Sequence, residues 1–237
     1  MPTALAKDHA KRWGLGDVFG GLIAAQVLAL ISFQLVYSIA GWDQDFKPTL
    51  VVFALFQIPL WSGYVGATLL AGRKGGGLSD FGWAAKRTDA LWGIPLGILC
   101  QLVLLPVIYW PLLKLFNISK DKLSEPAQEL ADRAGGLGGW VVLFVMVAIC
   151  APIVEELFYR GLVLQSLIKA GLPGWVGALV SVALFAVVHF RLLQLLGLFA
   201  FGLVLAGLAL RTSRLGPSIW AHGGFNATTV VYLYLSS

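Results

Sequence analysis

The sequence carries very little charge. Only 12% of its 237 residues are Asp, Glu, Lys or Arg, while 58% are hydrophobic and the mean hydropathy is +0.82. A soluble globular domain has roughly 25% charged and roughly 45–50% apolar residues. The 17 basic and 12 acidic side chains are too few to cover a 25.5 kDa protein in water. The composition therefore excludes a soluble domain and predicts a protein surrounded mostly by lipid.

Cysteines and clusters of basic residues are also scarce. The two cysteines, Cys100 and Cys150, both lie within hydrophobic runs, which excludes a disulfide framework and a cysteine zinc site. The net charge of +5 comes without a basic run or interleaved aromatic residues. We therefore expect no nucleic-acid partner, because basic loops on a membrane protein explain the excess. No internal repeat stands out, which argues against transporters built from duplicated halves.

Long apolar runs are what the sequence does contain. They are continuous rather than alternating, which favours transmembrane helices over a β-barrel. We expect an all-α, polytopic transmembrane bundle of about seven or eight spans that forms a single domain over residues 1–237, with the lipid bilayer as its main partner. The expected spans are 18–40, 50–71, 90–116, 140–170, 174–190, 192–210 and 217–235. Between the third and fourth spans, Ser124 is expected to cap a short surface helix over 126–133.

The distribution of Lys and Arg predicts the orientation. Eleven basic residues fall on the side of the N-terminus and five on the other side, with Arg191 assigned to neither. The larger group includes Lys7, Lys11 and Arg160, and the smaller group includes Lys47. Because cytoplasmic loops are enriched in Lys and Arg, we expect a multi-pass protein of the cell membrane with a cytoplasmic N-terminus.

A few ionisable residues lie inside the apolar runs. The chain has only four glutamates and three histidines. Glu155 and Glu156 are adjacent within the fourth expected span, and His189 and His222 also lie within expected spans. An ionisable side chain inside a membrane costs a few kcal/mol at least, so each needs a partner or a function. These residues point to one intramembrane site.

Helical spacing separates the roles of the two glutamates. Glu156 and Arg160 are four residues apart with the acid first, which favours an ion pair on one helix face and hence a supporting role. Glu155 lies about 100° around the helix from Glu156, outside this ion pair, and is therefore the candidate catalytic glutamate. The helix-breaking segment 171–174 would place Glu155 and His189 at equal heights of an antiparallel hairpin.

His222 and Asn226, four residues apart in the last expected span, share a helix face. Two kinds of hydrolytic chemistry fit this set of residues. Without a metal, Glu155 assisted by His189 would deprotonate a water, and His222 with Asn226 would stabilise the oxyanion. With a metal, Glu155, His189 and His222 would form a zinc site with an open water position. Both lead to peptide-bond hydrolysis. The sequence leaves Zn²⁺ as a candidate cofactor and none as certain.

Three motifs occur in order on successive expected spans: Glu155-Glu156-x-x-x-Arg160, Phe185-x-x-x-His189 and His222-x-x-x-Asn226. In these motifs the chain resembles the CPBP family of intramembrane proteases, the CAAX protease and bacteriocin-processing group. The resemblance covers roughly 140–231, which we expect to be the catalytic core.

The resemblance implies a bundle of about eight transmembrane helices around a conical cavity open to the cytoplasm. It also implies hydrolysis of membrane-anchored or hydrophobic peptide substrates, since eukaryotic members remove the last three residues of prenylated CAAX proteins. Glu155 and His189 become the water-activating pair, and His222 and Asn226 the oxyanion stabilisers. Glu156 and Arg160 support the site. The family chemistry fits either a glutamate protease or a metalloprotease.

Two other interpretations keep the same intramembrane residues. A non-proteolytic membrane scaffold or immunity protein would retain the motifs for helix packing. A proton-coupled transporter of small solutes would use Glu155 and His189 as a proton relay. Only the protease requires Glu155, His189 and His222 to converge together with a hydrogen-bond donor such as Asn226.

Overall fold

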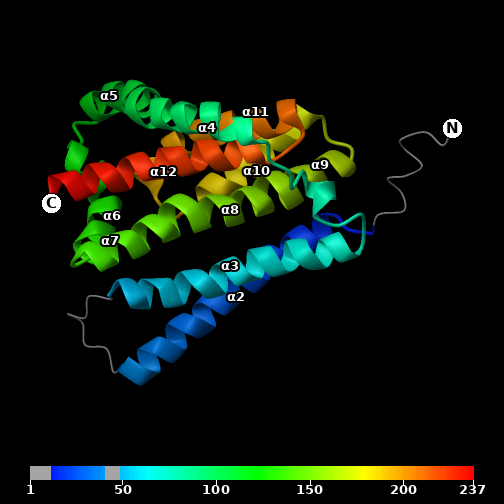
Figure 1. The fold of residues 1–237 in the computed structure, drawn as a ribbon, viewed down its shortest axis with the longest axis horizontal. Helices are drawn as coiled ribbons and strands as arrows, with labels where there is room; N and C mark the ends of the chain where they lie inside the picture. The colour runs from blue at the N-terminus through cyan, green and yellow to red at the C-terminus, as the bar shows by residue number, and fades with distance from the viewer. Residues whose placement is uncertain (1–11, 41–48) are drawn as a thin grey trace.

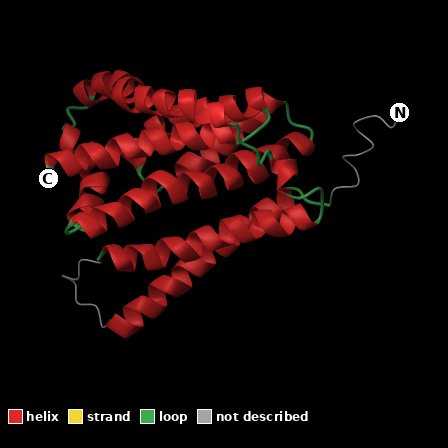
Figure 2. Cartoon of the chain, viewed as in Figure 1, coloured by secondary structure: helices red, strands yellow, loops and turns green. Residues whose placement is uncertain are grey.

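The computed structural model describes residues 12–40 and 49–237. These residues form helices without any strand (Figures 1 and 2), so the predicted all-α membrane bundle is confirmed. Lys7, Lys11 and Lys47, which entered the expected orientation, lie outside the described residues. The elements are α2 (Leu15–Ala40), α3 (Leu50–Arg73), η1 (Leu78–Phe81), α4 (Arg87–Leu99), η2 (Cys100–Leu104), α5 (Leu105–Leu115), α6 (Lys120–Asp132), α7 (Leu137–Phe144), η3 (Val145–Cys150), α8 (Ala151–Glu155), η4 (Glu156–Val163), α9 (Leu164–Lys169), α10 (Gly174–Val187), η5 (Leu192–Gln194), α11 (Leu195–Thr212) and α12 (Gly216–Ser236).

All seven expected helices are present, but they differ in how well they would span a membrane. Five stretches in the described part of the chain are long and apolar enough: Leu15–Ile39, Leu50–Arg73, Arg87–Leu115, Leu137–Lys169 and Leu192–Thr212. The helix α10 has only 14 residues because it ends at Val187, ahead of His189. The 21-residue α12 is long enough but carries several polar side chains, among them His222 and Asn226.

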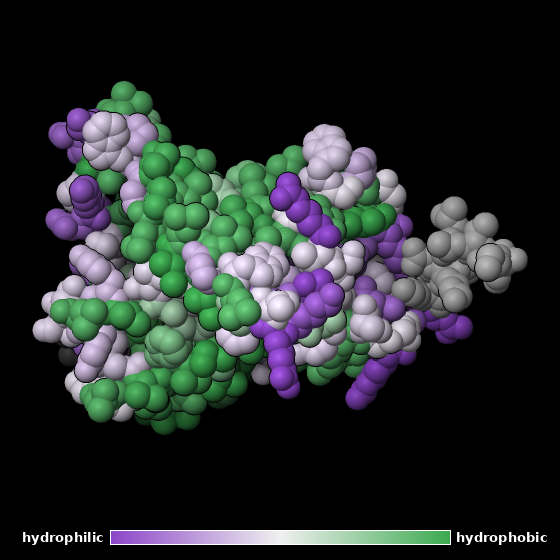
Figure 3. Space-filling model, turned by 45° about the horizontal axis from the view of Figure 1, so that its top comes forward, coloured by the Kyte–Doolittle hydropathy of each residue, from purple (hydrophilic) through white to green (hydrophobic). Residues whose placement is uncertain are grey.

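The surface of the bundle matches a lipid environment. Hydrophobic residues dominate the left half of the face in Figure 3, and hydrophilic residues gather at its left edge and in the middle and right of the view. Large apolar side chains are widely exposed, for example Leu30, Ile39 and Val107 at 66%, 85% and 66% of their surface. In Figure 1, α2 and α3 lie together beside the other helices and diverge away from the N-terminus. Apolar side chains exposed to this extent are stable only where hydrocarbon replaces water.

The closest helix packing joins α4 to α12 through glycines. Gly93 and Gly97 are four residues apart and form a small-x-x-x-small pattern that lets two helix backbones approach. A methyl group on Gly93 would lie 2.8 Å from Trp220 Cβ, and one on Gly97 would overlap the carbonyl oxygen of Ala221. These contacts hold α12, and with it His222, in the bundle.

We expect Gly97→Ala to destabilise the protein by about 1–3 kcal/mol, because the added methyl forces the two backbones apart. Thermal unfolding in detergent measures the effect. Gly207→Ala in α11 is the matched control, since nothing lies within 4 Å of a methyl group there. Equal melting temperatures for the two variants would contradict the close packing.

The surface helix between the third and fourth spans starts earlier than expected. The helix α6 begins at Lys120, with Ser119 at the N-cap position. Ser124 is not the cap: it lies within the helix, where its hydroxyl donates to the carbonyl of Asp121 at 3.2 Å. A helix over 126–133 would have Pro126 in its first turn, where proline is usual. In the structure the helix continues through Pro126, and Leu130 beyond the proline packs against the cluster of Leu50, Ala134 and Leu143.

Two arginines change the charge count behind the expected orientation. Arg160 is completely buried beside Glu156, so it does not belong to a cytoplasmic loop. Arg191 lies 4.0 Å from Glu129 of α6 and therefore belongs to the end of the molecule opposite the described N-terminal residues. The comparison becomes ten against six instead of eleven against five. The bias keeps its direction, and the cytoplasmic N-terminus stays a prediction.

Candidate functional site

The fourth span is a continuous helix with two π-helical stretches, η3 and η4, on either side of α8. In η3 the hydrogen bonds reach five residues back, so the N–H of Ala151 donates to Met146. The next acceptor, Val147, would need an N–H from residue 152, which is proline and has none. The side chain of Asn226 in α12 donates to this carbonyl at 2.7 Å. Because Pro152 has no N–H, the Val147 carbonyl is available to accept the hydrogen bond that positions Asn226.

The pair Glu156 and Arg160 forms the buried charge of the site. Arg160 Nη1 donates to Glu156 Oε1 at 2.9 Å, and both side chains have no exposed surface. Arg160 Nη2 donates to the carbonyl of Gly202 in α11 at 3.2 Å. The guanidinium also lies 4.5 Å from the ring centre of Phe185 in α10. The ion pair expected from the spacing is therefore present, and it connects three helices.

His222 lies between the two glutamates. Its Nδ1 is 2.9 Å from Glu156 Oε1, and its Nε2 is 3.7 Å from Glu155 Oε2. The side chain of Glu155 is 14% exposed, compared with none of Glu156. The spacing argument assigned Glu156 to structure and Glu155 to chemistry, and the geometry places Glu155 on the accessible side of the cluster.

His189 follows the end of α10 and approaches the same cluster through Phe185. Its Nδ1 is 2.6 Å from the carbonyl of Phe185. The rings of His189 and His222 meet the Phe185 ring edge-on, with centroid distances of 4.7 Å and 6.0 Å. Because the carbonyl can only accept, Nδ1 of His189 is the donor in this contact, and Nε2 is the ring nitrogen left for a base.

The sequence missed one buried polar group beside the cluster, Tyr64 of α3. Tyr159 donates its hydroxyl hydrogen bond to the Tyr64 hydroxyl at 3.1 Å. Tyr159 lies four residues after Glu155, so helical spacing was a signal for it. No comparable signal existed for Tyr64, because the second span is separated from the motifs by more than 80 residues and shows only hydrophobicity.

The metal alternative finds no matching arrangement in the structure. Within residues 12–40 and 49–237, no three His, Cys, Asp or Glu side chains are close enough together to hold a metal ion. Glu155 and His222 approach each other, but the nearest described partners of His189 are the carbonyl and ring of Phe185. The expected set of Glu155, His189 and His222 does not fit a zinc site as placed, and no step below passes through a metal.

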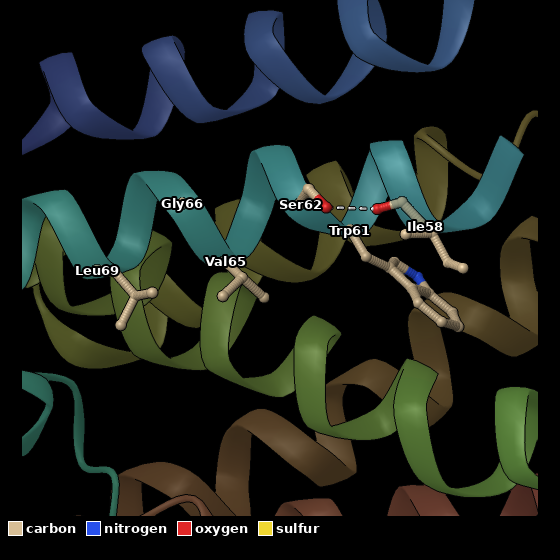
Figure 4. Close-up of a pocket in the computed structure, with 6 residues that line it drawn as sticks. All are labelled: Ile58, Trp61, Ser62, Val65, Gly66 and Leu69. Atoms are coloured by element: carbon tan, nitrogen blue, oxygen red, sulfur yellow. Dashed lines mark hydrogen bonds between the residues drawn. The ribbon is translucent and has the colours of Figure 1, made fainter. Parts of the chain in front are cut away.

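A hollow in the described surface lies on α3 and not at the polar cluster. It has a volume of about 380 Å³ and a mainly apolar lining. Figure 4 shows Trp61, Val65 and Leu69 projecting from one side of α3 toward the neighbouring helices. The residues around it are Ile58, Trp61, Ser62, Val65, Gly66 and Leu69. None of the residues predicted for catalysis lines this hollow.

Comparison with known proteins supports the resemblance seen in the motifs. Residues 137–228 match the family model described as type II CAAX prenyl endopeptidase Rce1-like. All three motifs, from Glu155 to Asn226, fall within the matched segment. No curated protein and no solved structure matches the chain. The predicted similarity to CAAX-type intramembrane proteases is therefore confirmed over residues 137–228.

Proposed function

We propose, from the match of residues 137–228 to Rce1-like CAAX endopeptidases, that this protein is an intramembrane endopeptidase. It hydrolyses a peptide bond of membrane-anchored or hydrophobic peptide substrates with a water activated by Glu155 and His189. The observation that carries the proposal is the approach of Glu155 Oε2 to His222 Nε2 at 3.7 Å, beside the buried Glu156–Arg160 pair. Residues 140–231 act as the catalytic core of a single domain.

In the first step, Glu155 and His189 activate the water. Glu155 is the accessible carboxylate of the cluster, whereas Glu156 is held by both Arg160 and His222. His189 presents Nε2 as a base because its Nδ1 is bound to the Phe185 carbonyl. The water loses its proton to this pair as its oxygen attacks the carbonyl carbon of the substrate. The carbon–nitrogen bond of the substrate then breaks as this proton passes to the leaving nitrogen.

His222 and Asn226 stabilise the negative oxygen that forms on the substrate. The Nδ1 of His222 donates to Glu156, so the ring is held with Nε2 facing Glu155 and the substrate oxygen. The Asn226 amide uses one N–H for the Val147 carbonyl and keeps a second for the substrate. Donors that are already in position where charge develops lower the barrier without reorganising. Glu156 and Arg160 hold His222 and the helices in place.

The membrane setting defines the kind of substrate. The exposed apolar surface supports a site at membrane depth, and we infer that the cleaved peptide is itself bound to the bilayer or hydrophobic. We infer a cell-membrane protein with its N-terminus toward the cytoplasm, on the basis of the ten-to-six distribution of basic residues. Prenylated and unmodified peptides are both candidates.

A cleavage assay tests the function directly. Purified protein in detergent micelles is given an internally quenched peptide ending in a farnesylated Cys-aliphatic-aliphatic-X sequence, or the same peptide without the farnesyl group. We expect wild type to cut at least one of them. We expect His189→Ala to lower kcat by about 10²–10⁴-fold, because proton transfer loses its base.

Three outcomes separate the alternatives. Cleavage by His189→Ala at the wild-type rate would reject the assignment of the base. A lack of cleavage by folded wild type would favour the scaffold or transporter interpretation. We expect a zinc chelator to leave cleavage unchanged, whereas loss of cleavage that added Zn²⁺ restores would support the metalloprotease instead.

A further inference from the structure

The hollow on α3 continues into a second hollow toward the end of the helix. The second hollow has a volume of about 260 Å³ and is lined by Leu69, Gly72, Arg73, Gly77 and Leu78. Leu69 lines both hollows, so together they form one groove along α3, which we call the α3 groove. No residue of the proposed mechanism lines either part. The α3 groove is therefore separate from the candidate active site.

The first part of the α3 groove offers a mainly apolar surface. Gly66 has no side chain, and a methyl group added there would meet no neighbouring atom within 4 Å. The Ser62 hydroxyl donates to the Ile58 carbonyl of the same helix at 2.8 Å (Figure 4), so it is already hydrogen-bonded. Ile58 and Leu69 are 54% and 45% exposed. Because attraction here comes from close apolar contact, this part suits a hydrocarbon chain.

The other end of the α3 groove carries a positive charge. Arg73 is the last residue of α3 and of an apolar stretch that is long enough to span a membrane. No acidic side chain of residues 12–40 and 49–237 forms an ion pair with Arg73, whereas the adjacent Lys74 is paired with Asp17. A guanidinium binds a phosphate through two parallel hydrogen bonds. The groove thus joins an apolar surface to a cation that suits a phosphate.

The length of the α3 groove matches one leaflet of a bilayer. From Ile58 to Arg73 the helix advances by 15 residues, which is about 22 Å at 1.5 Å per residue. A bilayer with its headgroups is about 40–45 Å thick, so one leaflet measures about 20–22 Å. Arg73 then lies at the depth of the headgroups and Ile58 near the midplane. On the orientation inferred above, this is the cytoplasmic leaflet, which carries the anionic lipids.

We propose that the α3 groove binds one anionic phospholipid, with an acyl chain over Ser62 and Gly66 and the phosphate on Arg73. A zwitterionic phospholipid carries a compensating positive charge in its headgroup, so Arg73 holds it less firmly. The proposal goes beyond the peptidase function and does not depend on it, because the groove contains no catalytic residue. It assigns a binding site to the second span, which lies outside the matched segment 137–228.

Native mass spectrometry of the purified full chain tests the proposal. The protein is given equal amounts of dioleoyl phosphatidylglycerol and dioleoyl phosphatidylcholine in detergent. We expect wild type to retain one phosphatidylglycerol in preference to phosphatidylcholine. Arg73→Gln should lower this preference by about fivefold, the effect of one basic residue next to anionic lipid. Gly66→Leu should abolish retention, because its side chain occupies the open space of the groove.

Two variants serve as matched controls. Arg87→Gln removes another exposed arginine that does not line the groove. Gly20→Leu adds the same side chain on α2, at a position where a methyl group also meets nothing within 4 Å. Both should retain phosphatidylglycerol as wild type does. Because a ligand stabilises the folded state that binds it, phosphatidylglycerol should raise the melting temperature of wild type and both controls but not of Gly66→Leu.

Three results would overturn the proposal. Wild-type retention of phosphatidylglycerol by both Arg73→Gln and Gly66→Leu would show an unspecific lipid shell. Equal retention of the two phospholipids by wild type would reject the role of Arg73. Retention of the quenched farnesylated peptide, lost in Gly66→Leu, without retention of phosphatidylglycerol would assign the groove to the substrate. None of these results bears on the cleavage test, so the two proposals fail separately.

Discussion

Replacing Arg160 with methionine is expected to lower the free energy of unfolding by about 3–5 kcal/mol. The change leaves Glu156 charged in a site where neither side chain has exposed surface. It also removes the hydrogen bond to the Gly202 carbonyl and the contact with Phe185, so α10 and α11 both lose a connection to the fourth span. Thermal unfolding in detergent should show a decrease in melting temperature of roughly 10 °C.

Two variants check the cause of that decrease. Arg191→Met removes an arginine that is 51% exposed and 4.0 Å from Glu129, so it should change the free energy of unfolding by less than about 1 kcal/mol. Combining Arg160→Met with Glu156→Gln removes the uncompensated charge and should recover part of the loss. A double variant that is as unstable as the sum of the two single variants would show that charge burial is not the cause.

Replacing Glu155 with glutamine is expected to lower kcat by about 10²–10⁴-fold with little effect on folding. The amide has nearly the same shape but cannot take a proton from water. Glu155 has one described ionic contact, with His222 at 3.7 Å, and is partly accessible, so the melting temperature should change little. Cleavage of the quenched farnesylated peptide and thermal unfolding are measured on the same preparation.

Glu129→Gln provides the matched control, since Glu129 is 49% exposed on α6 and makes one long ion pair. It should retain wild-type cleavage. If Glu155→Gln retains more than about a tenth of the wild-type kcat, Glu155 does not activate the water. Together, Arg160→Met and Glu155→Gln separate the roles of the two adjacent glutamates. Glu156 supports the fold, and Glu155 supplies the chemistry.

Predictions from local spacing agreed with the structure where a single helix determined the outcome. Glu156 and Arg160 pair because residues four apart on one helix meet whatever the rest of the chain does. The turn after Lys169 also lies where Gly171 and Pro173 placed it. Loop charges were harder to assign: Arg160 counted as a loop residue in the sequence but is buried, because Glu156, Gly202 and Phe185 converge on it.

The partners of the other site residues depend on several helices at once. The sequence placed His222 in the catalytic set but not between the two glutamates, which requires the register of α12 against the fourth span. Two contacts hold that register: Gly223, where an added methyl group would lie 2.9 Å from the Ala148 carbonyl oxygen, and the hydrogen bond from Asn226 to Val147. Tyr64 comes from a helix without any motif, so its contact with Tyr159 follows only from the packing of α3 on η4.

The sequence by itself determined the solvent, the helices and the residue types of the site. Scarce charge and long apolar runs predict a protein surrounded by lipid. Ionisable residues within those runs are costly, so each needs a partner or a function. Only the tertiary structure decided how these residues meet. It placed Glu155 on the accessible side of His222, bound Asn226 to the carbonyl that Pro152 leaves free, and paired Tyr64 with Tyr159. The physical reason is that helix spacing acts within one turn, whereas these contacts depend on π-helical register and backbone approach between different helices.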